Sequence, residues 1–381
     1  MKNKSDCREA FLALVRAGLW GVVNENENPN ENLFEGLDWN MVQKLAEEQS
    51  VMGLVAAGAE WFTVNGSRCM IPLTEKLTLL GRGQLIEQRN EAMNRFIAEL
   101  LKRMREADIK VVLVKGQGVA QCYEKPLWRT AGDIDLLLDE ENYKKTKTSI
   151  SALSEKTVSE DIDKKHLSVQ IGGFTIELHG RMPFVLSRRA DKVIDEVIAD
   201  TCKSGGTREW RNGSVIICLP KANNDVILVF THYLHHFFIE GVGLKQVCDW
   251  CRLLWTYRDE LDKKVLEIRL RDMGLMSEWK VFASLAVNKL GMPSEAMPFY
   301  NPSSSYKRKA KRALTLVLKS GNLGHNKDVS YRAKHSAFIA NVITFFRRLR
   351  DFVGFSLIFP VDSPKFFLTY CTDRIKNYGN R

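Results

Sequence analysis

The sequence predicts an α+β protein in which a small mixed β-sheet lies between two helical regions. Apolar residues recur at helical spacing over 1–108 and again over 222–381, whereas short β-branched runs punctuated by glycine fill 109–221. The chain has 381 residues, 45% of them hydrophobic, which is enough to bury more than one packed unit. We therefore expect a helical N-terminal region, a central α/β core and a helical C-terminal region with these boundaries.

The N-terminal region should consist of amphipathic helices. Phe11, Leu14 and Val15 begin the helical pattern, and a stretch rich in Asn, Glu and Pro at 24–32 predicts a surface loop. One long helix over about 75–107 leads into the central core.

Six short segments of the central region have strand character. The segment 109–114 is a β-branched run that ends at a glycine turn, and 133–138 is a second apolar run. Gly172-Gly173 and Asn212-Gly213 each provide the two-residue turn that suits a β-hairpin. The predicted hairpin strands are 166–171 with 174–179, and 207–210 with 214–219.

The charge balance favours an anionic partner. The chain carries a formal net charge of +10, which suits a nucleotide, a nucleic acid, an acidic polymer or an anionic membrane surface, and charge alone does not choose among them. The densest basic cluster, 307–312, has no aromatic residues interleaved with it. We predict that it is the solvated face of a helix.

The chain shows no sign of export or of a membrane span. Its eight cysteines are scattered, its first residues lack a signal sequence, and no apolar run reaches eighteen residues. We expect a cytoplasmic protein with reduced thiols and no transmembrane segment, and the oligomeric state is left open.

Three carboxylates are predicted to meet at one end of the sheet. Side chains alternate along a strand, so Asp133 and Asp135 share a face while Ile134 and Leu136 enter the core. The same alternation puts Glu177 on the polar face of a neighbouring strand. Like charges held this close need a cation, and Mg²⁺ or Mn²⁺ prefers oxygen ligands. Such a site suits in-line phosphoryl displacement.

Residues around this acidic pair are suited to bind the phosphates of a nucleoside triphosphate. A glycine turn after the first strand would let backbone amides approach phosphate, and a helix from about Val119 would add its dipole. Two cationic side chains could neutralise phosphate oxygens. The predicted nucleotide-binding residues are Lys115, Gly116, Gln117, Arg129 and Gly132.

The order of these motifs resembles the DNA polymerase β-like nucleotidyltransferase superfamily. A strand, Lys115-Gly116, the stretch from Arg129 to Asp135, and then Glu-Leu-His ending at His179 follow its pattern. The chain is most similar to the superfamily's uncharacterised nucleotidyltransferase family, also at Leu37-Asp-Trp39 and at Asp249-Trp250. The chain departs from the superfamily's usual pattern at two positions. Gln117 stands where the superfamily more often has Ser or Gly, and Glu177 stands where it more often has Asp. The resemblance implies a minimal catalytic fold with metal ligands at Asp133, Asp135 and Glu177.

The implied activity is metal-dependent transfer of a nucleoside monophosphate from a nucleoside triphosphate to an acceptor, with release of pyrophosphate. The acceptor, whether a small molecule, a sugar, a protein or RNA, is not readable from the sequence. The alternatives are a non-catalytic nucleotide-sensing or protein-interaction module on the same fold, and an RNA-binding protein. His179, His232, His235, His236 and Asp249 have either a place in the cleft or a packing role, with packing favoured for the three clustered histidines.

Overall fold

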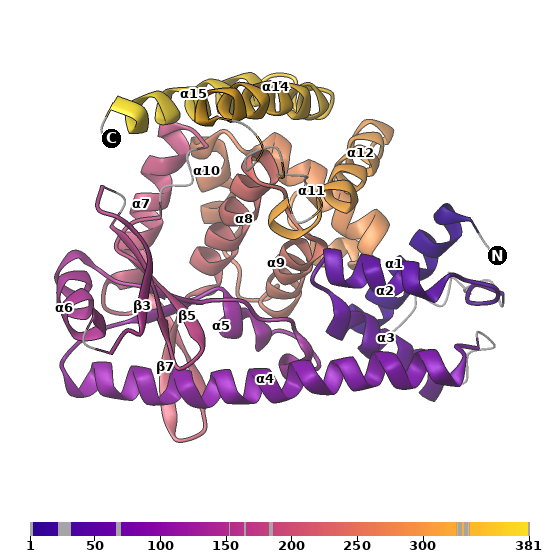
Figure 1. Ribbon diagram of the computed structural model, residues 1–381, viewed down its shortest axis with the longest axis horizontal. Coiled ribbons are helices and arrows are strands. Elements are labelled where there is room, and N and C mark those ends of the chain that lie inside the picture. The colour runs from indigo at the N-terminus through magenta and orange to yellow at the C-terminus, as the bar shows by residue number, and fades with distance from the viewer. Residues whose placement is uncertain are drawn as a thin grey trace.

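The computed structural model describes residues 3–21, 32–65, 70–151, 153–163, 165–182, 186–324, 326, 330, 334 and 336–379. The sheet lies at one end of the molecule and the first three helices at the other, with α4 running beneath both (Figure 1). Most of the predicted loop at 24–32 lies outside the described residues.

The N-terminal region is helical, as predicted. Asn3 caps α1, since its side chain accepts hydrogen bonds from the amides of Ser5 and Asp6. The long helix α4 has 34 residues and begins and ends close to the predicted bounds. The helices are α1 (Lys4–Trp20), α2 (Trp39–Glu48), α3 (Met52–Val64) and α4 (Leu73–Glu106).

A five-stranded mixed sheet follows, in the order β1-β2-β5-β4-β3. Only β2 and β5 run parallel, and they are the central neighbours that carry the predicted carboxylates. A short helix, α5 (Gly116–Ala120), and a 3₁₀ turn, η1 (Pro126–Trp128), lie between β1 and β2. The strands are β1 (Val112–Val114), β2 (Ile134–Leu137), β3 (Lys156–Asp161), β4 (His166–Ile171) and β5 (Phe174–His179).

The hairpin of β4 and β5 has the predicted bounds, whereas β3 was missed. All but one residue of β3 are exposed, so the strand shows no alternation of apolar and polar residues. It pairs with β4 alone, at the edge of the sheet, where both faces can remain polar. The predicted first strand is shorter than expected, because only Val112–Val114 pair with β2.

A second hairpin and a set of helices complete the chain. The hairpin forms its own two-stranded sheet, but its turn is Gly213-Ser214, one residue later than predicted, because Asn212 still pairs with Val215. Its strands are β6 (Thr207–Asn212) and β7 (Val215–Pro220). The helices are α6 (Glu140–Ser151), α7 (Arg188–Cys202), α8 (Ala222–Ile239), α9 (Leu244–Thr256), α10 (Lys263–Met273), α11 (Met276–Leu290), η2 (Ser294–Ala296), α12 (Ser304–Ser320), η3 (Asn322–Gly324), α14 (Ala337–Ser356) and α15 (Asp362–Gly379).

Two hydrophobic cores hold these elements together. One joins the N-terminal and C-terminal helices, and the other lies between the sheet and the second half of α4. The helix α4 contributes Leu79 to the first core and Met93 and Ile97 to the second. Hydrogen bonds also link the N-terminal and C-terminal helices of the first core. For example, Trp20 Nε1 at the end of α1 donates to the carbonyl of Leu290 at the end of α11, at 2.6 Å. Because α4 packs into both cores, it holds the sheet in place relative to the helices α8 and α9, which belong to the first core.

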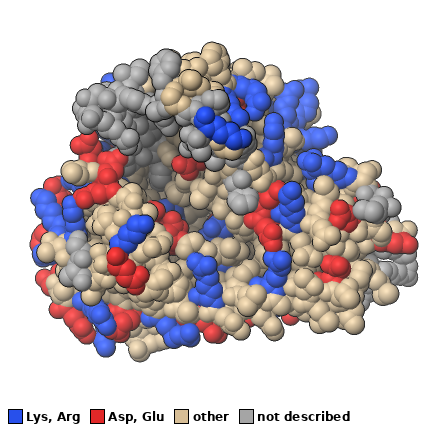
Figure 2. Space-filling view, in the orientation of Figure 1, with Lys and Arg blue, Asp and Glu red and all other residues tan. Residues whose placement is uncertain are grey.

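The basic cluster at 307–312 is confirmed as a solvated helix face. Lys307, Arg308, Lys311 and Arg312 are exposed on α12, while Ala310 is buried. Basic side chains gather where α12 lies in the space-filling view, and the same face is hollowed between the sheet and the helices (Figure 2). Among the described residues, no helix combines the length and the apolar character that crossing a membrane requires.

Candidate active site

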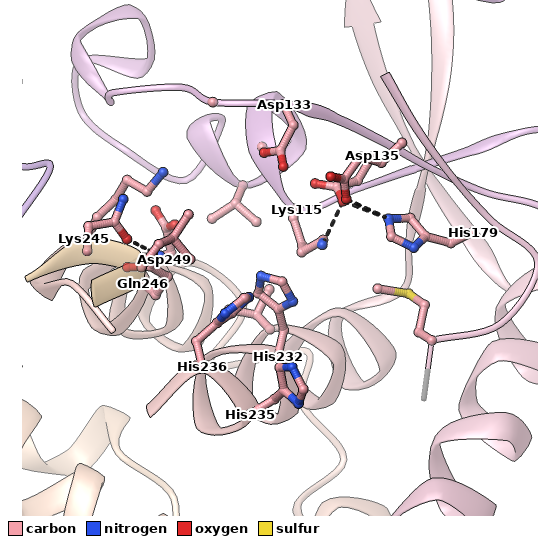
Figure 3. Close-up of a pocket in the computed structure, with 18 of the residues that line it drawn as sticks. Lys115, Asp133, Asp135, His179, His232, His235, His236, Lys245, Gln246 and Asp249 are labelled. Atoms are coloured by element: carbon pink, nitrogen blue, oxygen red, sulfur yellow. Dashed lines mark hydrogen bonds and ion pairs between the residues drawn. The ribbon is translucent and has the colours of Figure 1, made fainter. Parts of the chain in front are cut away.

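A cavity of about 620 Å³ opens between the polar face of the sheet and the helices α8 and α9. Strands β2 and β5 supply its acidic side, and the helices supply histidines, Lys245 and Gln246 on the opposite side (Figure 3). Its volume is in the range of sites that bind a small ligand. The cavity is therefore large enough for a nucleotide.

The three predicted carboxylates meet in this cavity. Asp135 lies beside Glu177 in the parallel register of β2 and β5, and Asp133 immediately precedes β2. One carboxylate oxygen from each of the three residues lies within 4.8 Å of the others. Ile134 and Leu136, the alternate residues of β2, are buried in the core behind the site. The strand alternation that the sequence predicts thus places the acidic groups on the cavity side.

The acidic cluster carries more negative charge than its surroundings balance. Repulsion by Asp135, with burial, raises the pKa of Asp133. Burial also acts to raise the pKa of Asp135, but the charge of Lys115 and a hydrogen bond from His179 outweigh it and hold that pKa well below its usual range. Lys115 Nζ lies 2.7 Å from Asp135 Oδ1. One ammonium group thus faces three carboxylates.

These residues fit a divalent cation. A hard cation with oxygen ligands neutralises carboxylates that would otherwise repel one another. Burial acts to raise the pKa of Glu177, but a hydrogen bond from His166 and the charge of Lys115 lower it overall, so Glu177 is ionised and able to bind a cation. The ligand atoms of the predicted set, Asp133, Asp135 and Glu177, lie close enough together to hold one ion.

The segment after β1 differs from the expected glycine loop. The helix α5 begins at Gly116, not near Val119, so Gly116-Gln-Gly118 forms its first turn. Lys115 has a positive φ of 57°, which is costly for a residue with a side chain and is often found at functional sites. This backbone geometry accompanies a side chain that reaches Asp135. Lys115, Gly116 and Gly132 all line the cavity.

Gln117 and Arg129 lie differently from the other predicted nucleotide-binding residues. Gln117 is buried, and its Nε2 donates to Asn90 Oδ1 at 2.8 Å instead of facing the cavity. Arg129 lines the cavity but donates from Nε and Nη2 to both oxygens of Asp249, at 2.7 and 2.8 Å. Burial would lower the pKa of Arg129, but the charge of Asp249 raises it further above its usual range. The charge of Arg129 is therefore already paired within the protein.

The sequence did not single out Lys245, a cation that faces the same cavity. It lies in the first turn of α9, and no described carboxylate is within ion-pair distance of its ammonium group. Burial and then the nearby charge of Arg129 lower the pKa of Lys245. No local motif marks this residue, because only the packing of α9 against the sheet brings it to the cavity.

The histidines of α8 form part of the cavity wall. His232, His235 and His236 all line it, which puts the clustered histidines in the cleft rather than in the interior of the helix bundle. Burial, with the charge of Lys115, holds the pKa of His232 well below its usual value, so His232 is neutral. His236 Nδ1 lies 2.9 Å from Glu240 Oε2.

His166 was missed, although the sequence contained the signal for it. Because Gly172-Gly173 fixes the register of the hairpin, His166 must face His179 across β4 and β5. Their ring centroids are 5.0 Å apart, and both residues line the cavity. Counting back from the turn would have placed two imidazoles beside Glu177.

A mixed sheet with three carboxylates around one cavity forms the candidate active site. The sequence profile of the uncharacterised nucleotidyltransferase family matches residues 35–288, more than half of the chain. The chain therefore belongs to this family, as its motifs indicated. No curated protein and no solved structure shows significant similarity to it.

Proposed function

We propose that the chain is a metal-dependent nucleotidyltransferase that moves a nucleoside monophosphate from a nucleoside triphosphate to an acceptor and releases pyrophosphate. The observation that carries this proposal is the meeting of Asp133, Asp135 and Glu177 within 4.8 Å at a cavity of ligand size, in a chain of this family. Mg²⁺ or Mn²⁺ bound by these carboxylates would supply charge stabilisation to the phosphoryl group in transit.

The protein's own groups position the reactants. Lys115 holds Asp135 ionised and in place, and its positive-φ backbone forms the turn between β1 and α5 beside the acidic cluster. Gly116 and Gly132 bring backbone to the cavity without a side chain in the way. Gln117, which is buried away from the cavity, and Arg129, which lies in the cavity wall, hold these segments in place through Asn90 and Asp249.

The triphosphate is proposed to extend from the carboxylates toward α9. Lys245 supplies a positive charge that the described residues do not pair, and the N-terminal end of a 13-residue helix favours anions. Gln246 Oε1 is buried beside it without a hydrogen-bond partner, which suits a hydroxyl or amino group of nucleotide or acceptor. The helical regions would thus select the acceptor. We also propose that the reaction takes place in the cytoplasm.

The first test is calorimetric titration of ATP, GTP, CTP and UTP with Mg²⁺. We expect Mg²⁺-dependent binding of at least one nucleotide, lost in the Asp133→Asn, Asp135→Asn double variant. A matched control replaces two exposed aspartates, Asp259→Asn and Asp272→Asn, and should bind as the wild type does. Absence of nucleotide binding by the wild type would refute the proposal.

The second test addresses turnover and acceptor class. The wild type is incubated with α-phosphate-labelled nucleotide and, separately, with a small-molecule extract, a protein fraction or RNA. Transfer of label to one fraction, absent in the double variant, would establish the reaction and name the class of acceptor. Tight binding with no transfer to any fraction would favour the nucleotide-sensing alternative.

A further inference from the structure

Two imidazoles and a carboxylate form a second group of possible metal ligands beside the acidic cluster. His166 on β4 and Glu177 and His179 on β5 share one face of the sheet, and their ligand atoms all lie within 4.8 Å of one another. Glu177 belongs to both groups. In Figure 3, His179 lies on the side of Asp135 away from Lys245, so the imidazole group extends the metal-binding surface away from α9.

We propose that His166, Glu177 and His179 bind a second cation of the late transition-metal class, such as Co²⁺ or Zn²⁺. The site lies next to the oxygen-only position of Asp133 and Asp135 and shares Glu177 with it. For its role in catalysis this assignment rests on the proposed function, but the binding itself does not.

The separations of the ligand atoms suit a small cation. His166 Nε2 lies 3.3 Å and His179 Nε2 3.5 Å from the same oxygen, Glu177 Oε2. Bonds of roughly 2.0–2.1 Å in a tetrahedron place ligand atoms about 3.3–3.4 Å apart. The three side chains therefore need only small adjustments to bind one ion.

The ligand types select the metal. Imidazole nitrogen suits Zn²⁺ and the late transition metals, whereas Mg²⁺ and Mn²⁺ prefer oxygen ligands, and Mg²⁺ also keeps much of its water. Two histidines and one carboxylate leave a fourth position open for water or a substrate oxygen, as in catalytic metal sites. An all-oxygen position and a mixed nitrogen and oxygen position would thus lie side by side with different metal preferences.

A purely positioning role for the histidines makes a different prediction. His179 Nε2 also lies 2.8 Å from Asp135 Oδ1, so both imidazoles could serve only to hydrogen-bond and orient the carboxylates. In that case the oxygen-only position would account for all cation binding. Replacing His166 would then leave the number and the spectrum of bound transition-metal ions unchanged.

The test is titration of the full chain with Co²⁺, followed by visible absorption and calorimetry. An ion bound by imidazole at low coordination number gives a far stronger visible band than octahedral Co²⁺ in an oxygen-only site. We expect this band in the wild type, and Co²⁺ affinity at this site at least about tenfold weaker in His166→Gln. His236→Gln, the same change on the opposite wall of the cavity, is the matched control and should leave the band intact.

Two further variants make the result decisive. Asp133→Asn should keep the Co²⁺ band, since Asp133 belongs only to the oxygen site, and Glu177→Gln should lose it. His166 is partly exposed, so His166→Gln should remain folded, which circular dichroism checks.

A band of wild-type intensity in His166→Gln, or no band in the wild type, would overturn the inference. Mg²⁺-dependent nucleotide binding is measured on the same samples, so that failure of the imidazole site and failure of the proposed function are told apart.

Discussion

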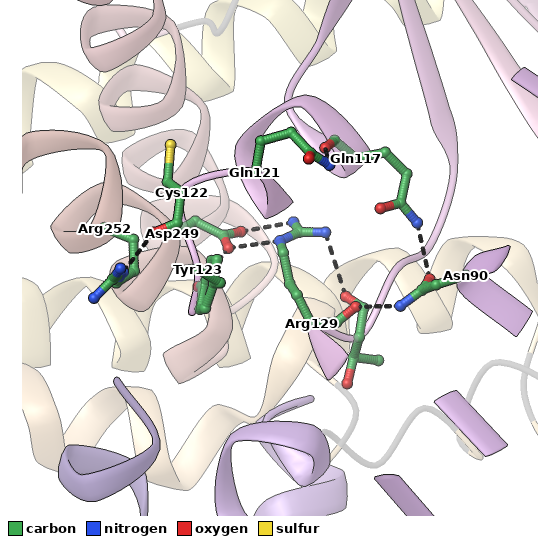
Figure 4. A network of polar contacts seen from close by, with 9 residues as sticks. Asn90, Gln117, Gln121, Cys122, Tyr123, Arg129, Asp249 and Arg252 are labelled. Atoms are coloured by element: carbon green, nitrogen blue, oxygen red, sulfur yellow. Dashed lines mark hydrogen bonds and ion pairs between the residues drawn. The ribbon is translucent and has the colours of Figure 1, made fainter. Parts of the chain in front are cut away.

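Two clusters of charged side chains lie close together in this protein and are organised in opposite ways. Arg129 and Asp249 neutralise each other: Asp249 accepts from the guanidinium through both oxygens and also from the Tyr123 hydroxyl at 2.7 Å (Figure 4). Around Asp135, one lysine faces three carboxylates that open to the cavity. A balanced network stabilises the fold, whereas an unbalanced one is ready to bind a cation.

This difference separates two residues that look alike in the sequence. Lys115 and Arg129 both precede the Asp-Ile-Asp motif, and both were predicted to neutralise phosphate. In the structure, Arg129 fixes the helix α9 to the segment before β2, and Lys115 holds a proposed metal ligand. A residue's neighbours in space, not its neighbours in sequence, decide whether its charge is available to a ligand.

The largest expected effect comes from breaking the balanced cluster. Asp249→Ala would leave Arg129, whose side chain is 5% exposed, as a buried charge without its partner. We expect the free energy of unfolding to fall by about 3–5 kcal/mol, measured by urea denaturation. Asp259→Ala, at an aspartate whose side chain is 86% exposed, should change it by less than about 0.5 kcal/mol.

A double variant sharpens this result. Arg129→Met with Asp249→Leu removes both charges and keeps comparable volume, so it should recover most of the lost stability. If Asp249→Ala alone costs less than about 1 kcal/mol, the pair is not the structural anchor described here.

A buried carboxyl group that stays protonated in the folded chain, that of Glu278 in α11, provides a pH-dependent contrast. This side chain is fully buried, and burial, reinforced by the charge of Asp362 and opposed by Lys309, raises its pKa from 4.5 to about 8. Between these values the folded chain keeps a proton that the unfolded chain has lost, so Glu278 makes stability fall as pH rises. Its contribution is complete below about pH 4.5 and fully lost above about pH 8.

Glu278→Gln should remove this slope. Comparing the free energy of unfolding near pH 5 and near pH 9, we expect the wild type to lose on the order of 3 kcal/mol more than the variant. Glu295→Gln, at an exposed position, is the control and should retain the wild-type slope. Parallel pH profiles for wild type and Glu278→Gln would contradict the raised pKa.

A neutral hydrogen-bond network supports the balanced cluster and should contribute less than its charges. Asn90 Nδ2 donates to the carbonyls of Leu127 and Arg129, at 2.7 and 2.8 Å. Asn90→Leu keeps the volume but leaves these buried carbonyls without a donor, which should cost about 1–3 kcal/mol in urea denaturation. Gln88→Leu, at an exposed position on the same helix, should cost far less. Equal losses for both variants would show that the hydrogen bonds of Asn90 contribute nothing.

The parts of the fold that were predictable follow from local periodicity. The hairpin of β4 and β5 and the helix α4 carry clear patterns, and alternation along β2 places Asp135 on the polar face. The strand β3 carries no such pattern, because an edge strand exposed on both faces need not alternate. Local sequence patterns thus predicted most helices and strands, but they did not predict every strand of the sheet.

The site was predictable only where its residues lie on adjacent strands. Asp133, Asp135 and Glu177 are brought together by strand geometry that the sequence already implies. Lys245 reaches the cavity through the packing of α9, and Arg129 is paired with Asp249 across 120 residues of chain. Such contacts depend on tertiary packing, which single-sequence periodicity does not contain.

The smallest expected effect on stability tests the unbalanced cluster. Because Asp135 repels Asp133, Asp133→Asn in a buffer with chelator should leave the free energy of unfolding unchanged or raise it by less than about 1 kcal/mol. The sign is thus opposite to that expected for Asp249→Ala.

Saturating Mn²⁺ should reverse the order of wild type and variant. A ligand at about 100 times its dissociation constant stabilises the folded state by about 2.7 kcal/mol, and Asp133→Asn should lose much of that gain. Thermal unfolding with chelator and with Mn²⁺ measures both quantities on the same samples. A loss of stability in Asp133→Asn with chelator would mean that the acidic cluster is already balanced without a cation. The distinction between the two clusters would then disappear, because both would owe their organisation to the fold alone.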